Sequence, residues 1–210
     1  MILAFWSDKG GTGKSTLATT TAMALGLPIV DLDPQGDAAR WCKRAGHACT
    51  TLSNESWDTV KDTLGRLAME TEDVVVDCPP GHDPRSLSGA ALARLAVLVA
   101  GDGDSDLVAL GRGLEYLKRL KGAGNPGLAV AVALNKVNPH TILGRQTIEG
   151  LRGAAGEKGY RFLGAVGNRV SIRQSFGLGV SAIATGGAGA HEMRGVVEAI
   201  RDILSTEVQQ

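Results

Sequence analysis

The stretch Lys9-Gly10-Gly11-Thr12-Gly13-Lys14-Ser15-Thr16 decides the fold of this chain. It follows an apolar run, Ile2–Trp6, and leads into an Ala- and Thr-rich segment, Ser15–Leu25, that we expect to be a helix. A glycine-rich turn between a buried strand and a helix is the setting that a phosphate-binding loop, the P-loop, requires. Glycines let backbone N–H groups converge on phosphate oxygens, and the helix N-terminus adds the positive end of its dipole. We therefore expect Lys14 to contact the β- and γ-phosphates of a nucleotide and the Ser15 hydroxyl to bind Mg²⁺.

Outside this loop, short apolar runs alternate with longer helical patterns. Strands are predicted at Ile2–Trp6, Pro28–Leu32, Asp73–Asp77, Leu95–Ala100, Leu128–Leu134 and Tyr160–Val166. Helices are predicted at Ser15–Leu25, Asp37–Ala45, Trp57–Met69, Thr141–Lys158 and Ala190–Ser205, with another that carries the leucines from Leu107 to Leu120. The glycine-rich residues 186–189 are expected to form a loop. This order predicts one α/β domain over residues 1–210, a P-loop NTPase whose mostly parallel, twisted sheet has helices on both faces.

Composition excludes several classes of protein. Hydrophobic residues make up 43% and charged residues 21% of the chain, which is typical of a globular domain. Aromatic residues make up only 4%, so a stacking platform for single-stranded nucleic acid is not expected. The 3 cysteines form no C-x-x-C pair, which argues against a disulfide framework or a zinc site. No apolar run approaches the ~20 residues of a membrane span, and we expect a soluble, cytoplasmic protein.

Charge is balanced over the chain but not between its halves. The 22 basic and 22 acidic residues give a net charge of zero. Residues 1–105 carry a net charge of −5 and residues 106–210 a net charge of +5. A basic second half suits nucleic acid or an acidic partner, although acids gathered around a metal-phosphate site beside ordinary surface would produce the same asymmetry.

The P-loop departs from the standard motif G-x-x-x-x-G-K-[ST] at its first position, where Asp8 replaces glycine. A second lysine, Lys9, precedes the glycine pair. The pattern K-G-G-x-G-K-[ST] resembles the deviant Walker A motif of ParA/MinD-type ATPases. This resemblance implies a homodimer that forms on ATP binding and sandwiches the nucleotides. In such a dimer Lys9 would reach the phosphates of the second subunit and, with Lys14, serve catalysis.

A second motif, Asp31-Leu32-Asp33-Pro34-Gln35-Gly36, ends the second predicted strand. It is similar to the switch I sequence D-x-D-P-Q-G of the same family. A carboxylate at the carboxyl end of a strand beside a P-loop can orient water in line with the γ-phosphate. The resemblance assigns this catalytic role to Asp33. We expect Asp31 to be a supporting group near Mg²⁺, and Pro34, Gln35 and Gly36 to form the switch.

A third motif, Asp77-Cys78-Pro79-Pro80-Gly81, follows three consecutive valines. An acidic residue after a hydrophobic strand is the Walker B arrangement, so Asp77 is expected to hold Mg²⁺ through water. The segment is similar to the family's switch II, D-x-P-P-G, which makes Pro79, Pro80 and Gly81 the expected switch. The N–H of that glycine could sense the γ-phosphate. Cys78 fills the variable position, and we assign it no chemistry.

Two later segments also resemble the family. Asn135 stands where family members carry an asparagine that contacts adenine, and an asparagine that caps a strand end is the alternative. The segment from Gly167 to Gly177, which ends in Ser-Phe-Gly, is similar to the ParA segment P-R-N-V-R-L-S-E-A-P-S-F-G, although the family's proline and first arginine are not matched. The alignment places Arg169 on an arginine implicated in non-specific DNA binding.

A basic cluster surrounds this segment. Residues 142–173 hold six basic side chains against two acidic ones. We expect them to bind the phosphates of double-stranded DNA without reading its sequence. Ordinary solvated surface is the alternative. The residues expected to contact DNA are Arg145, Arg152, Arg169 and Arg173.

The last predicted helix bears on membrane binding. Its apolar residues, which run from Met193 to Leu204 at helical spacing, form one face that we expect to pack on the domain. Its polar face includes Glu192, Glu198, Asp202 and Glu207, which anionic lipid would repel. MinD proteins end in a basic membrane-targeting helix, so this tail favours a ParA-like protein that does not bind membranes.

The combined motifs most resemble the small ParA proteins of plasmid partition. The resemblance implies a Mg²⁺-dependent ATPase that forms ADP and phosphate, binds non-specific DNA as an ATP-dependent dimer, and associates with the nucleoid. A ParB-like or other centromere- or cargo-bound adaptor would stimulate hydrolysis and release the dimer. Alternatives are a MinD-like or cargo-positioning ATPase, or a small-molecule enzyme such as a dethiobiotin-synthetase-like ligase, which needs neither Lys9 nor D-P-Q-G.

Overall fold

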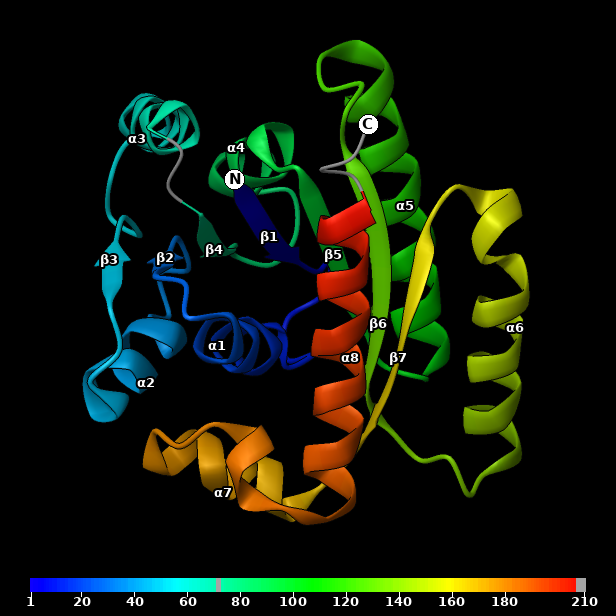
Figure 1. Cartoon of the computed structure of the whole chain (residues 1–210). Helices are drawn as coiled ribbons and strands as arrows, with labels where there is room; N and C mark the ends of the chain where they lie inside the picture. The colour runs from blue at the N-terminus through cyan, green and yellow to red at the C-terminus, as the bar shows by residue number, and fades with distance from the viewer. Residues whose placement is uncertain (71–72, 207–210) are drawn as a thin grey trace.

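The computed structural model describes residues 1–70 and 73–206 (Figure 1). Within these residues seven strands form one sheet in the order β3-β2-β4-β1-β5-β6-β7, and every pairing is parallel. The strands are β1 Ile2–Trp6, β2 Ile29–Asp31, β3 Cys49–Thr51, β4 Val74–Asp77, β5 Leu95–Ala100, β6 Ala129–Val137 and β7 Arg161–Gly167. The predicted parallel α/β sheet is confirmed.

Helices cover both faces of this sheet (Figure 1). They are α1 Lys14–Leu25, α2 Asp37–Ala45, α3 Trp57–Met69, α4 Pro84–Leu92, α5 Asp104–Ala123, α6 Ile142–Lys158, α7 Val170–Leu178 and α8 Gly187–Thr206, with a 3₁₀ turn at Ala182–Thr185. Apolar side chains of α3 to α6 pack on one face, and those of α1, α2, α7 and α8 pack on the other. Successive residues of β1 alternate between these two cores, because side chains of a strand point to opposite faces in turn.

Three elements were not predicted. Strand β3 is short, and two of its three residues are exposed threonines, so it carries no apolar pattern. Helix α4 begins within a stretch rich in proline and glycine, where Asp83 caps it by accepting a hydrogen bond from the Arg85 backbone N–H at 2.8 Å. Helix α7, at Val170–Leu178, lies in a segment that the sequence distinguishes only by its basic residues. These elements could not be predicted because their sequences contain turn-forming residues or lack a periodic pattern of apolar residues.

The expected loop at residues 186–189 is wrong, because α8 begins at Gly187. Packing requires a glycine at position 189 in this first turn. A Cβ placed there would lie 3.1 Å from Ile172 and 3.2 Å from Arg169, both at α7. The glycine therefore permits close packing of α8 against α7 rather than forming a loop.

The predicted packing of the last helix is confirmed. Its apolar residues Met193, Val196, Val197, Ile200 and Ile203 are buried. Glu207 of the expected polar face lies outside the described residues. Across the described part of the chain, no helix is long and apolar enough to cross a membrane.

Strand register places the three motifs at one edge of the sheet. Asp77 at the end of β4 lies beside Asp31 at the end of β2 and beside Phe5 near the end of β1. The loops that follow these three central strands therefore leave the sheet side by side. This carboxyl edge is where open α/β sheets bind ligands.

Candidate nucleotide site at the carboxyl edge of the sheet

The P-loop connects β1 to α1, and its glycines are required by backbone geometry. Gly11 and Gly13 have φ angles of 80° and 84°, in the left-handed region that favours glycine. Gly13 is also the N-cap of α1, whose first turn holds no acidic residue. A Cβ on Gly13 would lie 2.1 Å from Asn135 Nδ2, so no larger residue fits. The loop thus presents a helix N-terminus suited to an anion.

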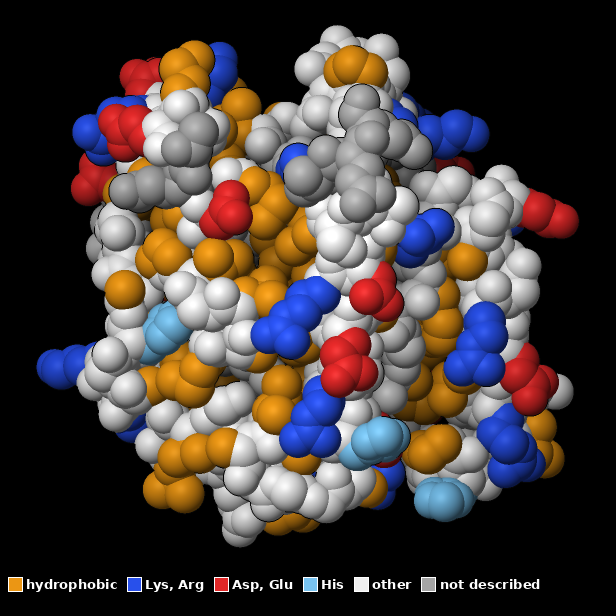
Figure 2. Space-filling view, viewed as in Figure 1, with side chains coloured by type: hydrophobic (Ala, Val, Ile, Leu, Met, Phe, Trp, Pro, Cys, Tyr) orange, Lys and Arg blue, Asp and Glu red, His pale blue; other side chains and the backbone are white. Residues whose placement is uncertain are grey.

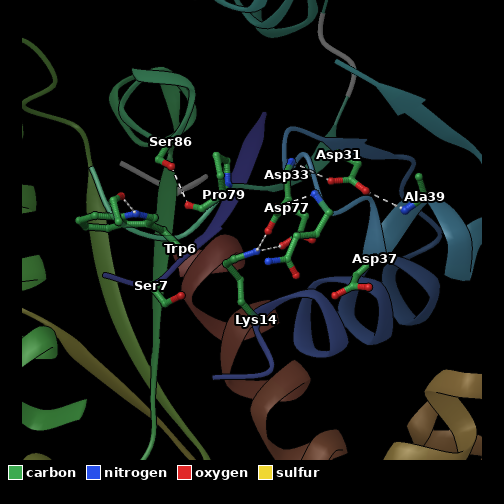
Figure 3. Close-up of polar contacts among 12 residues, drawn as sticks. Trp6, Ser7, Lys14, Asp31, Asp33, Asp37, Ala39, Asp77, Pro79 and Ser86 are labelled. Atoms are coloured by element: carbon green, nitrogen blue, oxygen red, sulfur yellow. Dashed lines mark hydrogen bonds and ion pairs between the residues drawn. The ribbon is translucent and has the colours of Figure 1, made fainter. Parts of the chain in front are cut away.

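Lys14 is buried between two carboxylates (Figure 3). Its Nζ lies 2.7 Å from Asp77 Oδ1 and 3.5 Å from Asp33 Oδ2, and its side chain is 6% exposed. Burial opposes the charge of Lys14, but the two carboxylates outweigh burial and raise its pKa. The structure therefore brings the Walker A lysine, the Walker B aspartate and the switch I aspartate together around one fixed positive charge.

Asp77 has the free oxygen that a metal site requires. The residue is fully buried, and its Oδ2 has no hydrogen-bond partner among the described residues. Burial raises the pKa of Asp77, although Lys14 and the Ser15 side chain lower it. Mg²⁺ is usually held by one or two carboxylates together with substrate phosphates and water. The unpartnered Asp77 oxygen and the nearby Ser15 hydroxyl fit this chemistry.

Side chains alone form no metal site in residues 1–70 and 73–206. These residues contain no group of three or more His, Cys, Asp and Glu side chains that could hold a metal ion. Burial raises the pKa of the Cys78 thiol.

Asp31 shapes switch I. Its Oδ1 accepts a hydrogen bond from the Asp33 backbone N–H at 2.9 Å, and its Oδ2 accepts one from the Ala39 N–H at 2.8 Å (Figure 3). Burial and the neighbouring Asp77 raise the pKa of Asp31 to about 6. Each oxygen accepts one backbone hydrogen bond, so Asp31 holds switch I and the start of α2 in place, and its expected supporting role near Mg²⁺ stays a prediction.

Asp33 is held in place by the turn that follows it. Its Oδ1 accepts a hydrogen bond from the Gln35 N–H at 3.0 Å, and the Gly36 N–H donates to its backbone oxygen at 2.8 Å. The remaining oxygen, Oδ2, faces Lys14. Pro34 and Gln35 are exposed, whereas Asp33 is buried. The D-P-Q-G turn thus points one carboxylate oxygen into the site and leaves the rest of switch I on the surface.

Switch II is tied to the end of β1. The Gly81 N–H donates to the Ser7 backbone oxygen at 2.9 Å, and the Trp6 indole N–H donates to the Gly81 oxygen at 2.8 Å. The Ser86 hydroxyl of α4 donates to the Pro79 oxygen at 2.6 Å (Figure 3). The N–H that was expected to sense the γ-phosphate is therefore engaged by Ser7 in this conformation.

Asp8, at the position where the standard motif has glycine, joins three elements. Its Oδ2 accepts hydrogen bonds from Arg112 of α5 at 2.8 Å, and its Oδ1 lies 3.2 Å from His82 Nε2 in the segment after switch II. The His82 ring also contacts Trp6 and Tyr116 edge to face. Sequence reasoning noted the departure at Asp8 but missed these partners, because they lie 74 and 104 residues away along the chain.

Asn135 supports the P-loop from behind. Its Nδ2 donates to the Thr12 oxygen at 2.8 Å, and the side chain is buried. Lys136, a non-glycine residue with a φ of 61°, donates from its Nζ to the Gly11 oxygen. Two consecutive residues at the end of β6 thus hold two P-loop carbonyls. The expected contact between Asn135 and adenine stays a prediction, and the contact with Thr12 was not foreseen.

A cavity of about 270 Å³ opens in front of the P-loop. Residues 10–16, Asp33, Gln35, Pro80, Lys136, Arg173 and Phe176 are among those that line it. Sequence reasoning missed Phe176 as a wall of this cavity and placed Arg173 on a DNA surface. Helix α7 reaches the site because Arg44 of α2 donates to the Phe176 oxygen at 3.1 Å.

The arginines expected to bind DNA lie in different surroundings. Arg145 and Arg152 are exposed on α6, where Figure 2 shows basic side chains interleaved with acidic ones. Arg169, at the start of α7, forms an ion pair with Glu192 of α8, whose Oε2 also accepts a hydrogen bond from the Gly167 N–H at 2.8 Å. Figure 1 shows α6 and α7 on opposite sides of α8. The structure therefore does not gather these arginines into one patch.

Comparison with known proteins gives one relative in sequence. No protein-family model matches the chain. Over 102 residues the chain is 33% identical to "Maintenance of carboxysome distribution protein A" of Gloeobacter kilaueensis, a stretch that covers 44% of this chain and 44% of that protein. The match therefore spans less than half the length of the curated relative.

Solved structures share the fold over almost the whole chain. Apo McdA from Cyanothece has a TM-score of 0.77 at 18% identity and covers 95% of this chain and 99% of its own. A putative plasmid partition protein of Borrelia burgdorferi, bound to AMPPNP, has a TM-score of 0.73 at 14% identity, with coverages of 96% and 98%. The cell division ATPase MinD of Pyrococcus furiosus has a TM-score of 0.71 at 19% identity, with the same coverages. The predicted resemblance to ParA/MinD-type ATPases is confirmed at the level of the fold.

Proposed function

We propose that this protein is a Mg²⁺-dependent, ParA-like ATPase that uses an ATP-dependent dimer on non-specific DNA to position a cargo. One observation carries the proposal: Lys14 at the head of α1 is held by Asp77 and Asp33 beside a cavity that the P-loop lines. A cation fixed at a helix N-terminus, with one carboxylate for a metal and another for water, is the set of groups that phosphoryl transfer requires.

Each group has a defined part in hydrolysis. The P-loop N–H groups and Lys14 bind the phosphates, and Asp77 and Ser15 would hold Mg²⁺, which neutralises charge on the phosphate oxygens. Asp33 Oδ2 faces the same site and orients the attacking water. For the Gly81 N–H to reach the γ-phosphate, it must leave Ser7. Switch II would thereby report the bound nucleotide to α4 and α5.

Helix α6 would supply most of the contacts with DNA phosphates. Arg145, Arg152 and Lys158 are exposed on this helix, and Arg161 follows on β7. Arg169 contributes less because Glu192 already neutralises it. An interface of this kind contacts phosphates alone, so binding would be independent of sequence and would weaken steeply with salt.

The first candidate cargo is a plasmid or a chromosome. The sequence match to a protein named for carboxysome distribution favours a protein assembly as the second candidate. In both cases an adaptor bound to the cargo stimulates hydrolysis and releases the dimer. A membrane-bound cycle is disfavoured because the apolar face of α8 is packed on the sheet.

Binding to arbitrary double-stranded DNA tests this proposal directly. The protein is titrated with Mg²⁺ and either ATP or ADP over a series of salt concentrations. We expect binding with ATP only, falling steeply as salt rises. Dimerisation with ATP but no DNA binding at any salt would contradict the DNA part and point to a protein scaffold. ATP turnover only in the presence of a small acceptor molecule would instead support a ligase.

A further inference from the structure

Lys9 is held within its own chain. Its Nζ lies 2.9 Å from Asp106 Oδ1 and 2.9 Å from Ser105 Oγ, both in the first turn of α5. The proposed function requires the same ammonium group to reach the phosphates of a second copy. Asp106 and Ser105 take two of the three N–H donors of this ammonium group, so Lys9 must give up at least part of this contact when it turns to the phosphates of a second copy.

The acceptor is more firmly placed than the lysine. The Lys9 side chain is 44% exposed, whereas that of Asp106 is 19% exposed. The Asp106 N–H donates to the Gly103 oxygen at 2.9 Å. A Cβ on Gly101 or Gly103 would lie 3.0 Å or 3.1 Å from Asp106 Oδ2. These two glycines leave the space in which the carboxylate sits, so a change of partner requires rotation of the more exposed Lys9 side chain rather than of Asp106.

The surrounding recess offers Lys9 no equivalent acidic partner. A cavity of about 180 Å³ lies on this side of the P-loop, and Lys9, Asp102 and Asp106 are among its lining residues. Asp102 accepts a hydrogen bond from the Asn138 N–H at 3.1 Å. Asp106, by contrast, presents Oδ1 to Lys9. Among the described residues, the ion pair of Lys9 is therefore with Asp106.

We propose that Asp106 is a positioning residue for Lys9 that competes with the phosphates of the second copy and so sets how readily the dimer forms. This inference rests on the proposed function, in which Lys9 acts across the dimer. Each chain must release one Lys9, so the contact enters the dimer equilibrium twice. If monomers with the Lys9–Asp106 contact outnumber monomers without it by a few-fold, loss of the contact lowers the dimer dissociation constant about tenfold.

The test compares two isosteric variants of the same helical turn. D106N removes the carboxylate that holds Lys9, while D104N removes an exposed carboxylate beside it and is the matched control. Both changes have the same effect on net charge and a similar one on the helix dipole. Dimer dissociation constants are measured by sedimentation with Mg²⁺ and AMPPNP. We expect about tenfold tighter dimers for D106N and no change for D104N.

The K9A background separates a positioning role from a merely structural one. If Asp106 acts through Lys9, D106N has no effect on the dimer when K9A is also present. An equal strengthening in both backgrounds would overturn the proposal. A dimer of the unmodified protein that D106N leaves unchanged would overturn it as well, without touching the proposed function.

A separate experiment measures the Lys9–Asp106 contact in the monomer. Acylation of Lys9 by an N-hydroxysuccinimide ester, followed by peptide mass spectrometry, reports how free the amine is in the monomer. We expect D106N to accelerate acylation several-fold relative to D104N, and equal rates would overturn the proposal. Absence of any AMPPNP-dependent dimer in either protein would overturn the proposed function and the competing role of Asp106 together.

Discussion

Lys14 Nζ lies 2.7 Å from Asp77 Oδ1, which links the first turn of α1 directly to the end of β4. The pair is buried, so the attraction between the two charges is little screened by water. Because Asp77 is also the expected Mg²⁺ residue, the cation that binds phosphate and the anion that binds metal hold each other in register. A nucleotide with its metal would enter between groups that are already aligned.

Lys14→Ala should abolish productive nucleotide binding. Lys14 is the cation expected to contact the nucleotide phosphates. Removing one partner of such a buried, hydrogen-bonded charge pair between protein and ligand costs about 2–5 kcal/mol, so ATP affinity should fall by about thirtyfold or more. Isothermal titration with ATP and Mg²⁺ checks this, with Lys43→Ala on the exposed side of α2 as the control that removes the same charge. Retention of ATP affinity and hydrolysis by Lys14→Ala would sink the P-loop assignment.

Asp33→Asn should preserve ATP-dependent dimers but stop turnover. Asparagine keeps an oxygen for the Gln35 N–H but loses the negative charge that orients water. General-base contributions are typically about 10²–10⁴-fold, and the hydrolysis rate should fall by that factor. Steady-state release of phosphate, measured beside sedimentation with ATP, separates the two effects. An unchanged rate would remove Asp33 from the mechanism.

Asp31 should make stability depend on pH in an unusual direction. Burial raises the pKa of this carboxyl to about 6 from its ordinary value of 3.8. The folded protein then binds more protons than the unfolded chain between these values, so the contribution of Asp31 to stability falls as pH rises through this window. Between pH 4 and pH 7 the unmodified protein should lose about 2 kcal/mol of unfolding free energy relative to Asp31→Asn.

Urea unfolding at several pH values measures that difference. Asp58→Asn, an exposed change on α3, is the control and should show no such trend. A difference that grows with pH would mean that Asp31 is stabilised as a carboxylate, and would reverse the interpretation.

Asn135→Ala should weaken all nucleotides alike. The side chain donates to the Thr12 oxygen, so its loss releases the P-loop rather than a base contact. We expect ATP and GTP affinities to fall by the same factor, about five- to tenfold for one lost buried hydrogen bond. A selective loss of ATP affinity would instead establish the adenine contact that the family resemblance implies.

Reversing charge on α6 should weaken DNA binding. The double variant Arg145→Glu/Arg152→Glu removes two candidate phosphate contacts, so the slope of log affinity against log salt should become shallower by about 2. AMPPNP-dependent dimerisation should be unchanged. The matched control is Lys61→Glu/Arg66→Glu on α3, which makes the same change of charge on another helix. Equal DNA affinity in both double variants would exclude α6 as the contact surface.

Motifs that are contiguous in the chain could be predicted because neighbouring residues determine their geometry. Gly11 and Gly13 indicate a loop with positive φ angles, and the valines before Asp77 indicate a buried strand. Elements without a local pattern could not be predicted. Helix α7 became visible only through its packing on α2, where Gly179 approaches Arg44 so closely that a Cβ would lie 2.5 Å from the Arg44 side chain.

The sequence by itself determined the parallel α/β fold, the P-loop and the two switch segments, because each depends on residue types at short spacing. Only the tertiary structure decided which distant groups those residues meet. It placed Lys9 on Asp106, Asp8 on Arg112, and Arg169 on Glu192, pairs separated by 97, 104 and 23 residues. Ion pairs of this kind arise from the closure of the whole sheet and its helix layers, and no local pattern in the chain encodes them.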